Sequence, residues 1–102
     1  MSSVVLPPAP DNDRLAAWQV AEWVPVFFSD DSHVWRMLAA AWQRGTVEFR
    51  YWGGSMPGQM RRVTPIAVFT VVGSTGIYVE GDCHLRAERR IFRLDRVEWS
   101  ED

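Results

Sequence analysis

The sequence predicts an α+β fold in which about five short antiparallel strands close into a small barrel, with one helix packed against it. Two observations predict this fold. Hydrophobic residues between positions 34 and 42 recur with helical spacing, whereas those after position 46 alternate with polar residues, as in strands. The chain has 102 residues and is 47% hydrophobic, which suits a single domain with a real core.

The composition also limits the kind of protein. The formal net charge is −2, so binding of a polyanion would have to come from a local basic patch. The single cysteine, Cys83, allows no internal disulfide. The N-terminus does not look like a secretory signal, and no stretch approaches the roughly 20 apolar residues of a membrane span. We therefore expect a cytoplasmic protein that has no contact with a membrane.

Residues 1–28 are expected to form an N-terminal segment, and residues 29–102 the barrel domain with its leading helix. Residues 1–10 are rich in proline and serine, which indicates a flexible tail or an extended arm. The sequence DND at 11–13 can cap a short helix over about 14–23, and Pro25 discourages its continuation. Residues 24–28 are then either the end of this helix or a short strand.

A second helix is predicted to follow and to end at Gly45. Residues 29–32 (SDDS) supply candidate N-caps, with acids near the positive end of the helix. The expected apolar stripe consists of Val34, Leu38 and Trp42, with Trp35 and Ala39 beside them.

The strands are read from the alternation that follows. In residues 46–52 (TVEFRYW), Val47, Phe49 and Tyr51 share one face. A loop over 53–59 leads to a long strand over 60–72, where Pro65 indicates a bulge, an edge or two strand pieces. Residues 73–76 (GSTG) form a tight hairpin connection between this strand and one over 77–81. A loop over 81–88, a strand over 89–94 and a last short strand over 97–101 complete the prediction.

Five arginines lie between Cys83 and Trp99, although the chain as a whole is slightly acidic. They indicate either an anion-binding site or a solvated strand face with acidic partners. Alternation places Arg90 with Phe92 and Leu94 on one face of its strand. A partly buried guanidinium is costly unless an acid, a carbonyl or a ligand pairs with it. Arg93, on the other face, is expected to be an exterior charge.

Catalytic and metal chemistry is poorly represented. Cys83 and His84 are adjacent but have no second pair of metal ligands, so we expect no metal site and no cofactor. A small hydrolase that uses this pair is the weakest of our functional hypotheses. Glu80 and Asp82 are expected to pair with an arginine of the neighbouring strand rather than to act as acid and base.

From about position 34 to 97, the sequence resembles the WYL domain of bacterial regulators. The residues that carry the resemblance are the AAAWQRGTVEFRYWG segment, RRVTPIAV before and after Pro65, and RIFRLDRV at 90–97. The signature Trp-Tyr-Leu is here Ile77-Tyr78-Val79, which keeps its one polar group.

The resemblance implies an SH3/Sm-like barrel that acts as a non-enzymatic ligand sensor. It also implies binding of single-stranded DNA or RNA, or of a nucleotide, and a regulator or defence protein as partner. The ligand-binding positions carried over from the family are Arg62 (or Arg61), Tyr78, His84, Arg86, Arg90 and Arg96. Guanidinium forks suit phosphates, and an aromatic ring suits stacking.

An alternative is a protein–protein interaction or oligomerisation module in which the arginines are structural. In this interpretation Asp95 and Arg96 form a pair, and Trp18, Trp23 and Trp52 cover the interface of a homodimer. The residues before the second helix are too few for a winged helix-turn-helix. We therefore expect no direct binding to promoter DNA.

Overall fold

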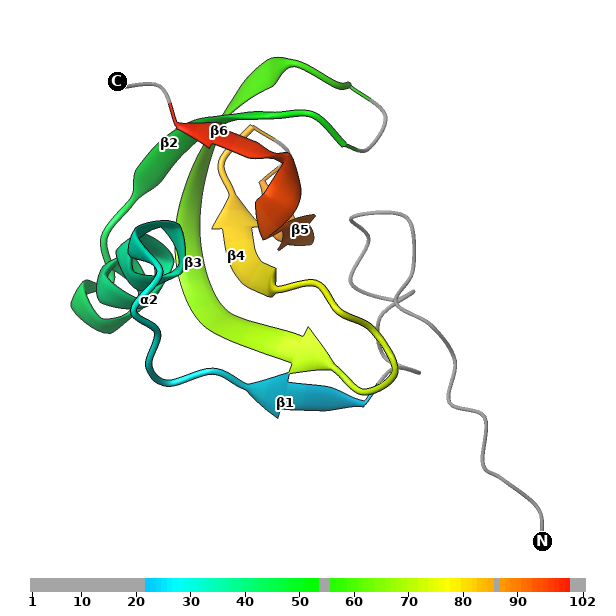
Figure 1. Ribbon diagram of the computed structural model, residues 1–102. Helices are drawn as coiled ribbons and strands as arrows, with labels where there is room; N and C mark the ends of the chain where they lie inside the picture. Colours follow the sequence, from blue (N-terminus) through cyan, green and yellow to red (C-terminus); the bar gives the residue numbers. More distant parts are fainter. Residues whose placement is uncertain (1–21, 54–55, 86, 100–102) are drawn as a thin grey trace, which may run out of the picture.

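The computed structural model describes residues 22–53, 56–85 and 87–99. These residues form one α-helix, one short 3-10 helix and six strands (Figure 1). The elements in chain order are β1 (Trp23–Pro25), α2 (Ser32–Gln43), β2 (Val47–Tyr51), β3 (Gln59–Val71), β4 (Tyr78–Cys83), β5 (Glu88–Arg93), η1 (Leu94–Arg96) and β6 (Val97–Trp99). The predicted α+β class, with a helix before an antiparallel sheet, is confirmed.

The sheet has the strand order β5-β4-β3-β2-β6, and β1 pairs with the last residues of β3. The long strand β3 bends through the sheet, and its register shifts between Pro65 and Ala67, which is the bulge that the proline indicates (Figure 1). The outermost strands, β5 and β6, are joined through η1, and no strand pairing connects them among the described residues. The described sheet is therefore curled but open at this point, so closure into a barrel remains a prediction.

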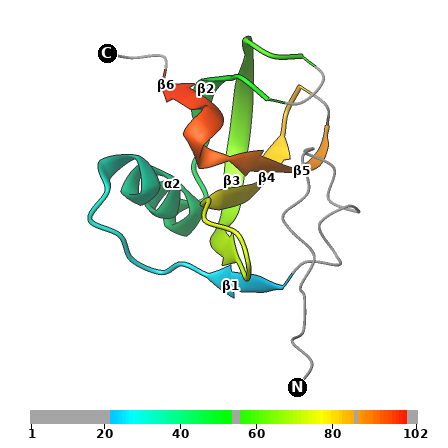
Figure 2. The ribbon, with the colours of Figure 1, turned by 45° about the vertical axis from the view of Figure 1, so that its right-hand side comes forward.

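Alternation along the strands produces two apolar clusters. The larger one lies on the inner face of the curl, where α2 packs against β3 (Figure 2). Its buried members are Val34, Met37, Leu38, Phe49, Tyr51, Val63, Val68, Val79, Cys83 and Phe92. The smaller cluster, on the outer face, consists of Phe69, Val71, Tyr78 and Ile91, with Trp23 packed against it.

Helix α2 begins as its cap residues predict. A side-chain oxygen of Asp31, the N-cap, accepts hydrogen bonds from the backbone N–H groups of His33 (2.9 Å) and Val34 (3.3 Å). The helix ends at Gln43, and Arg44, not Gly45, adopts the left-handed conformation, with φ of 54°. The N–H of Gly45 then bonds to the carbonyl of Ala40 and closes the helix end.

Replacing Asp31 by alanine is expected to destabilise the fold by about 1 kcal/mol, because two helix N–H groups lose their acceptor. Urea unfolding followed by circular dichroism measures this change. Asp30→Ala is the matched control, since Asp30 makes no cap hydrogen bond, and it should change stability by less than about 0.5 kcal/mol. Equal effects of the two variants would contradict this role of Asp31.

The predicted apolar stripe of the helix was partly wrong. Val34 and Leu38 are buried, but Trp35 and Trp42 are exposed, and Met37 and Ala40 take their place in the core. The helical spacing of the apolar residues allows burial of the face with Trp35 and Trp42 or of the face with Met37 and Ala40. In the structure Met37 belongs to the inner apolar cluster, so its face is the buried one.

Two predicted boundaries also differ. Strand β4 continues to Cys83, because Cys83 pairs with both Val63 and Glu88, so the loop expected to start at Gly81 begins at His84. Of the expected first helix over 14–23, residues 14–21 lie outside the described residues, and Trp23 begins β1 rather than ending a helix. The alternative of a strand near residues 24–28 is therefore the one that the structure adopts.

Candidate functional site

Arg61 is the most buried charged residue of the described structure, with 1% of its surface exposed. It alternates with Val63 along β3 and so faces the inside of the curl, opposite Phe49 of β2. Its Nη1 lies 3.9 Å from the sulfur of Cys83, and its guanidinium lies 6.0 Å from the centre of the Tyr51 ring. Arg61 therefore points into an aromatic and sulfur-lined interior.

The other nitrogen atoms of the Arg61 guanidinium, Nε and Nη2, are buried hydrogen-bond donors. They have no hydrogen-bond partner among the described residues. A thiol and an aromatic ring are weak partners for a full positive charge. Burial of a guanidinium under these conditions is unfavourable, and an anion that accepts both N–H groups would relieve it.

Arg90 faces the same side of the sheet from β5. It lies opposite Gly81 of β4, its side chain is 11% exposed, and its guanidinium pairs with Glu88. A Cβ at Gly81 would lie 2.6 Å from Cγ1 of Val63, so this position needs glycine for β3 and β4 to pack closely. Arg61 reaches Cys83 and Arg90 reaches Glu88, and Cys83 and Glu88 are register partners. We call Arg61 and Arg90 the inner arginine pair.

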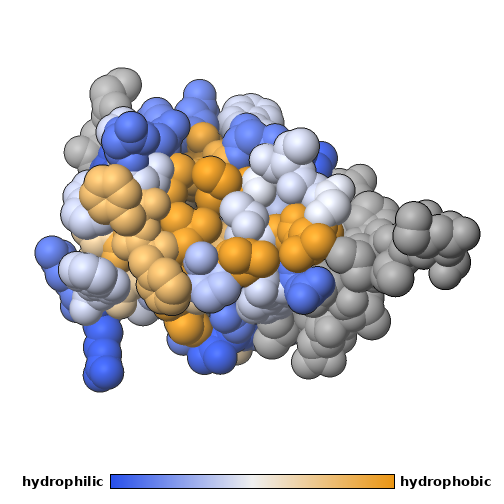
Figure 3. All heavy atoms as spheres, turned by 60° about the horizontal axis from the view of Figure 1, so that its bottom comes forward, coloured by the Kyte–Doolittle hydropathy of each residue, from blue (hydrophilic) through white to orange (hydrophobic). Residues whose placement is uncertain are grey.

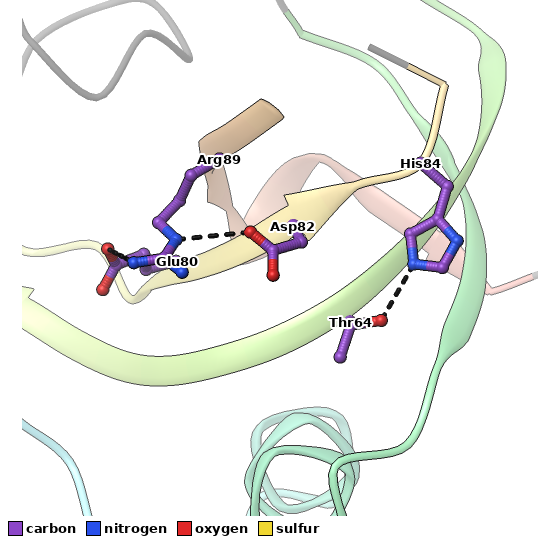
Figure 4. Close-up of polar contacts among 5 residues, drawn as sticks. All are labelled: Thr64, Glu80, Asp82, His84 and Arg89. Atoms are coloured by element: carbon purple, nitrogen blue, oxygen red, sulfur yellow. Dashed lines mark hydrogen bonds and ion pairs between the residues drawn. The ribbon is translucent and has the colours of Figure 1, made fainter. Parts of the chain in front are cut away.

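The other arginines of the sheet are mostly matched with acids on the outer face. Arg89 donates to Asp82 at 3.3 Å and lies 3.9 Å from Glu80, as the sequence predicted for these two acids (Figure 4). Arg93 forms a two-point pair with Asp95, at 3.0 and 3.2 Å. The hydrogen bond to Asp95 raises the pKa of Arg93, and desolvation opposes this shift only in part. In these pairs the charges of Arg89 and Arg93 are balanced by acids on the outer face.

Arg62 and His84 lie away from the inner arginine pair. The Arg62 side chain is 60% exposed and pairs with Glu48 at 3.3 Å. The His84 ring is exposed and forms a 2.9 Å hydrogen bond with the hydroxyl of Thr64 (Figure 4). Of the two arginines considered before Pro65, Arg61 is thus the inward one, and Arg62 faces outward. The shared face of Arg61 and Val63 was the signal that identifies it.

Tyr78 and Arg96 lie away from the inner arginine pair. Tyr78 is buried in the outer apolar cluster, with its ring 5.7 Å from that of Phe69, at the opposite end of β4 from Cys83. Arg96 lies in η1, half-buried, where it packs against Gly53. Arg86 lies outside the described residues. Of the predicted site residues, Arg90 and the alternative Arg61 are thus seen on the inner face.

The described residues offer little support for chemistry at Cys83 and His84. The thiol of Cys83 is buried on the inner face, whereas His84 is turned outward to Thr64, so the two side chains point to opposite sides. Among residues 22–53, 56–85 and 87–99, no three His, Cys, Asp or Glu side chains gather as metal ligands would. In the same ranges, no helix is long and apolar enough to span a membrane.

A separate cavity of about 480 Å³ opens between the start of α2, the connection from β3 to β4, and the segment from the end of β5 through η1. Its charged lining residues are Asp31, His33, Arg93 and Asp95. Asp31 caps the helix and Asp95 pairs with Arg93, so two carboxylates offset the one arginine there. An anionic ligand therefore has less reason to bind in this cavity than at the inner arginine pair.

The fold and the inner arginine pair define a small α+β domain with two largely buried arginines on the inner face of its sheet. The chain belongs to the WYL domain family, which matches residues 33–101. This confirms the resemblance seen around Ile77-Tyr78-Val79 and RIFRLDRV.

A solved structure with a similar fold is proteasome accessory factor B/C (PafBC) of Arthrobacter aurescens. It shares 26% sequence identity with this chain and has a TM-score of 0.58. The match covers 80% of this chain and 13% of PafBC, so this chain corresponds to a small part of that longer protein. No curated protein sequence matches this chain.

Proposed function

We propose that this WYL domain is a non-enzymatic sensing module that binds an anionic ligand at the inner arginine pair. The ligand class is single-stranded nucleic acid or a nucleotide. The observation that carries the proposal is Arg61, which is 1% exposed and keeps two buried N–H groups without an acceptor among the described residues. A phosphate offers two oxygens that match two N–H groups of a guanidinium fork.

Arg90 supports the same location. Its guanidinium is largely buried on the same face and pairs with Glu88, whose side chain is 53% exposed. An incoming phosphate can displace this acid into water at little cost, since Glu88 is already half-solvated. Arg90 would then turn from its acidic partner to the ligand. This exchange makes the site responsive to a ligand instead of permanently neutralised.

A sensing role without catalysis agrees with the placement of the candidate catalytic groups. Cys83 and His84 point apart, and Glu80 and Asp82 are engaged by Arg89 on the outer face. In this proposal the domain reports the ligand to a regulator or defence protein, as the family resemblance implies.

The test is fluorescence anisotropy with labelled single-stranded DNA and RNA oligomers, and with a labelled nucleotide, over a range of salt concentrations. We expect affinity to fall as salt rises, because phosphate contacts release counterions. Arg90→Ala should weaken binding about tenfold or more, the usual effect of losing a charge-assisted hydrogen bond.

Arg62→Ala is the matched control. Arg62 lies on the same strand as Arg61 but is exposed and paired with Glu48, so its removal should change affinity less than about threefold. Equal losses in Arg90→Ala and Arg62→Ala would indicate a non-specific surface effect. Absence of binding by the folded wild-type protein to all three probes would overturn the proposal.

A further inference from the structure

A large aromatic surface lies away from the inner arginine pair. Phe27, Phe28 and Trp42 are 73%, 75% and 74% exposed, and Trp35 is 42% exposed. Phe28 contacts Trp35 edge to face at 5.9 Å, and Trp35 contacts Trp42 in the same way at 6.5 Å. These four residues form one continuous surface, which we call the aromatic patch. Figure 3, which views the molecule from the side of β1, shows hydrophobic residues gathered on this face.

A small apolar hollow extends the patch. Phe27 and Trp42 line it together with Leu38 and Val68, and its volume is about 120 Å³. The exposed parts of the four aromatic side chains amount to on the order of 500 Å². A soluble monomer rarely exposes a larger continuous apolar surface, and a stable interface buries about 800 Å² on each partner. The aromatic patch would therefore supply more than half of one side of such an interface.

The exposed side of α2 has the pattern of a helix that packs against its own copy. Trp35, Ala39 and Trp42 occur at i, i+4 and i+7, so they lie along one stripe. Ala39 lies near the middle of the stripe. If two copies of α2 pack antiparallel about a two-fold axis near Ala39, Trp35 of each copy meets Trp42 of the other. The small Ala39 side chains leave room for the helices to approach.

Charges at the two ends of α2 fit the same arrangement. Asp30 precedes the helix and Arg44 ends it, and both are exposed and form no ion pair with another described residue. An antiparallel pair of helices brings Asp30 of each copy toward Arg44 of the other. The positive end of each helix dipole then lies beside the negative end of the other, which is favourable. Arg36, the charge nearest the stripe, lies 4.2 Å over the Trp99 ring and is thereby held toward β6.

We infer that the aromatic patch is a homodimer interface, in which α2 packs antiparallel against α2 of a second copy of this chain. This inference does not depend on the proposed ligand site. It places the interface on a different surface from the one expected from the sequence, which consists of Trp18, Trp23 and Trp52 and stays a prediction. Trp23 stacks on Phe69 at 4.1 Å, and Trp52 donates to Glu98, so both have partners within the domain. Trp18 lies outside the described residues.

Sedimentation equilibrium of the full chain from about 1 to 200 μM, at low and high salt, tests the inference. We expect a monomer–dimer equilibrium within this range. Trp42→Gln should weaken it about tenfold or more, because a central aromatic anchor is lost. Leu85→Gln is the matched control. Leu85 is also an exposed hydrophobic residue but lies after β4, away from α2, so association should not change.

A charge reversal tests the orientation of the helices. Arg44→Glu should weaken association about threefold to tenfold at low salt, since it would face Asp30 of the other copy. The double variant with Asp30→Arg and Arg44→Glu restores the opposite charges and should recover the wild-type affinity. A chain that stays monomeric up to about 200 μM would overturn the inference and leave the patch to a different partner. A dimer that is insensitive to Trp42→Gln would overturn it equally.

Discussion

Replacing Arg61 by methionine is expected to raise the stability of the domain and to abolish tight ligand binding at the same time. Methionine keeps the long unbranched shape but removes a buried charge whose partners in the described structure are a thiol and an aromatic ring. Replacement of buried charged groups by apolar residues of similar volume often stabilises a fold by about 1–4 kcal/mol. The ligand-free protein should therefore gain about 1 kcal/mol or more.

Binding should respond in the opposite direction. Loss of two charge-assisted hydrogen bonds weakens binding by about 3 kcal/mol or more, which is over a hundredfold. Chemical denaturation without ligand and anisotropy with oligonucleotides or a nucleotide measure the two effects on the same samples. Arg62→Met, on the exposed side of the same strand, should alter neither quantity much. A destabilised Arg61→Met variant with normal binding would show that Arg61 is structural.

The second large effect is expected at the centre of the core. Phe92 is completely buried, and its ring contacts those of Phe49 at 5.5 Å and Tyr51 at 5.0 Å, both edge to face. Phe92→Ala should destabilise the domain by about 3–5 kcal/mol, because it removes apolar contacts and leaves a cavity between β5 and β2. Small domains are stable by only about 5–15 kcal/mol, so a substantial unfolded population is expected on moderate warming.

Thermal and urea unfolding followed by circular dichroism measure this loss. Leu85→Ala is the control, because Leu85 is 48% exposed and makes a small contribution to the core. It should cost less than about 0.5 kcal/mol. If Phe92→Ala lost less than about 1 kcal/mol, the inner cluster would not be the main source of stability.

Local patterns were sufficient for most of the elements. The alternation of Val47, Phe49 and Tyr51 placed all three on the inner face, and Pro65 marked the bulge in β3. The acids before α2 identified its start, and Asp31 acts as its cap. Each of these features depends on interactions within a few residues, or on the strict two-residue period of a strand. Sequence alone therefore identifies them reliably.

What the sequence determined by itself is thus the family, the α+β class, and the inward position of Arg90. Only the tertiary structure decided two other points. These are which charged side chain is buried together with Arg90, and which apolar side chains remain exposed to solvent. Arg61 and Arg62 have the same chemistry, and the two-residue period of a strand puts Arg61 on the face of Val63. The packing of β3 beside Phe49 and Cys83 then makes this face the buried one. Likewise, helical spacing allowed either Trp42 or Met37 in the core, and the curvature of the sheet selected Met37. These choices depend on contacts between residues distant in sequence, and a local period cannot encode them.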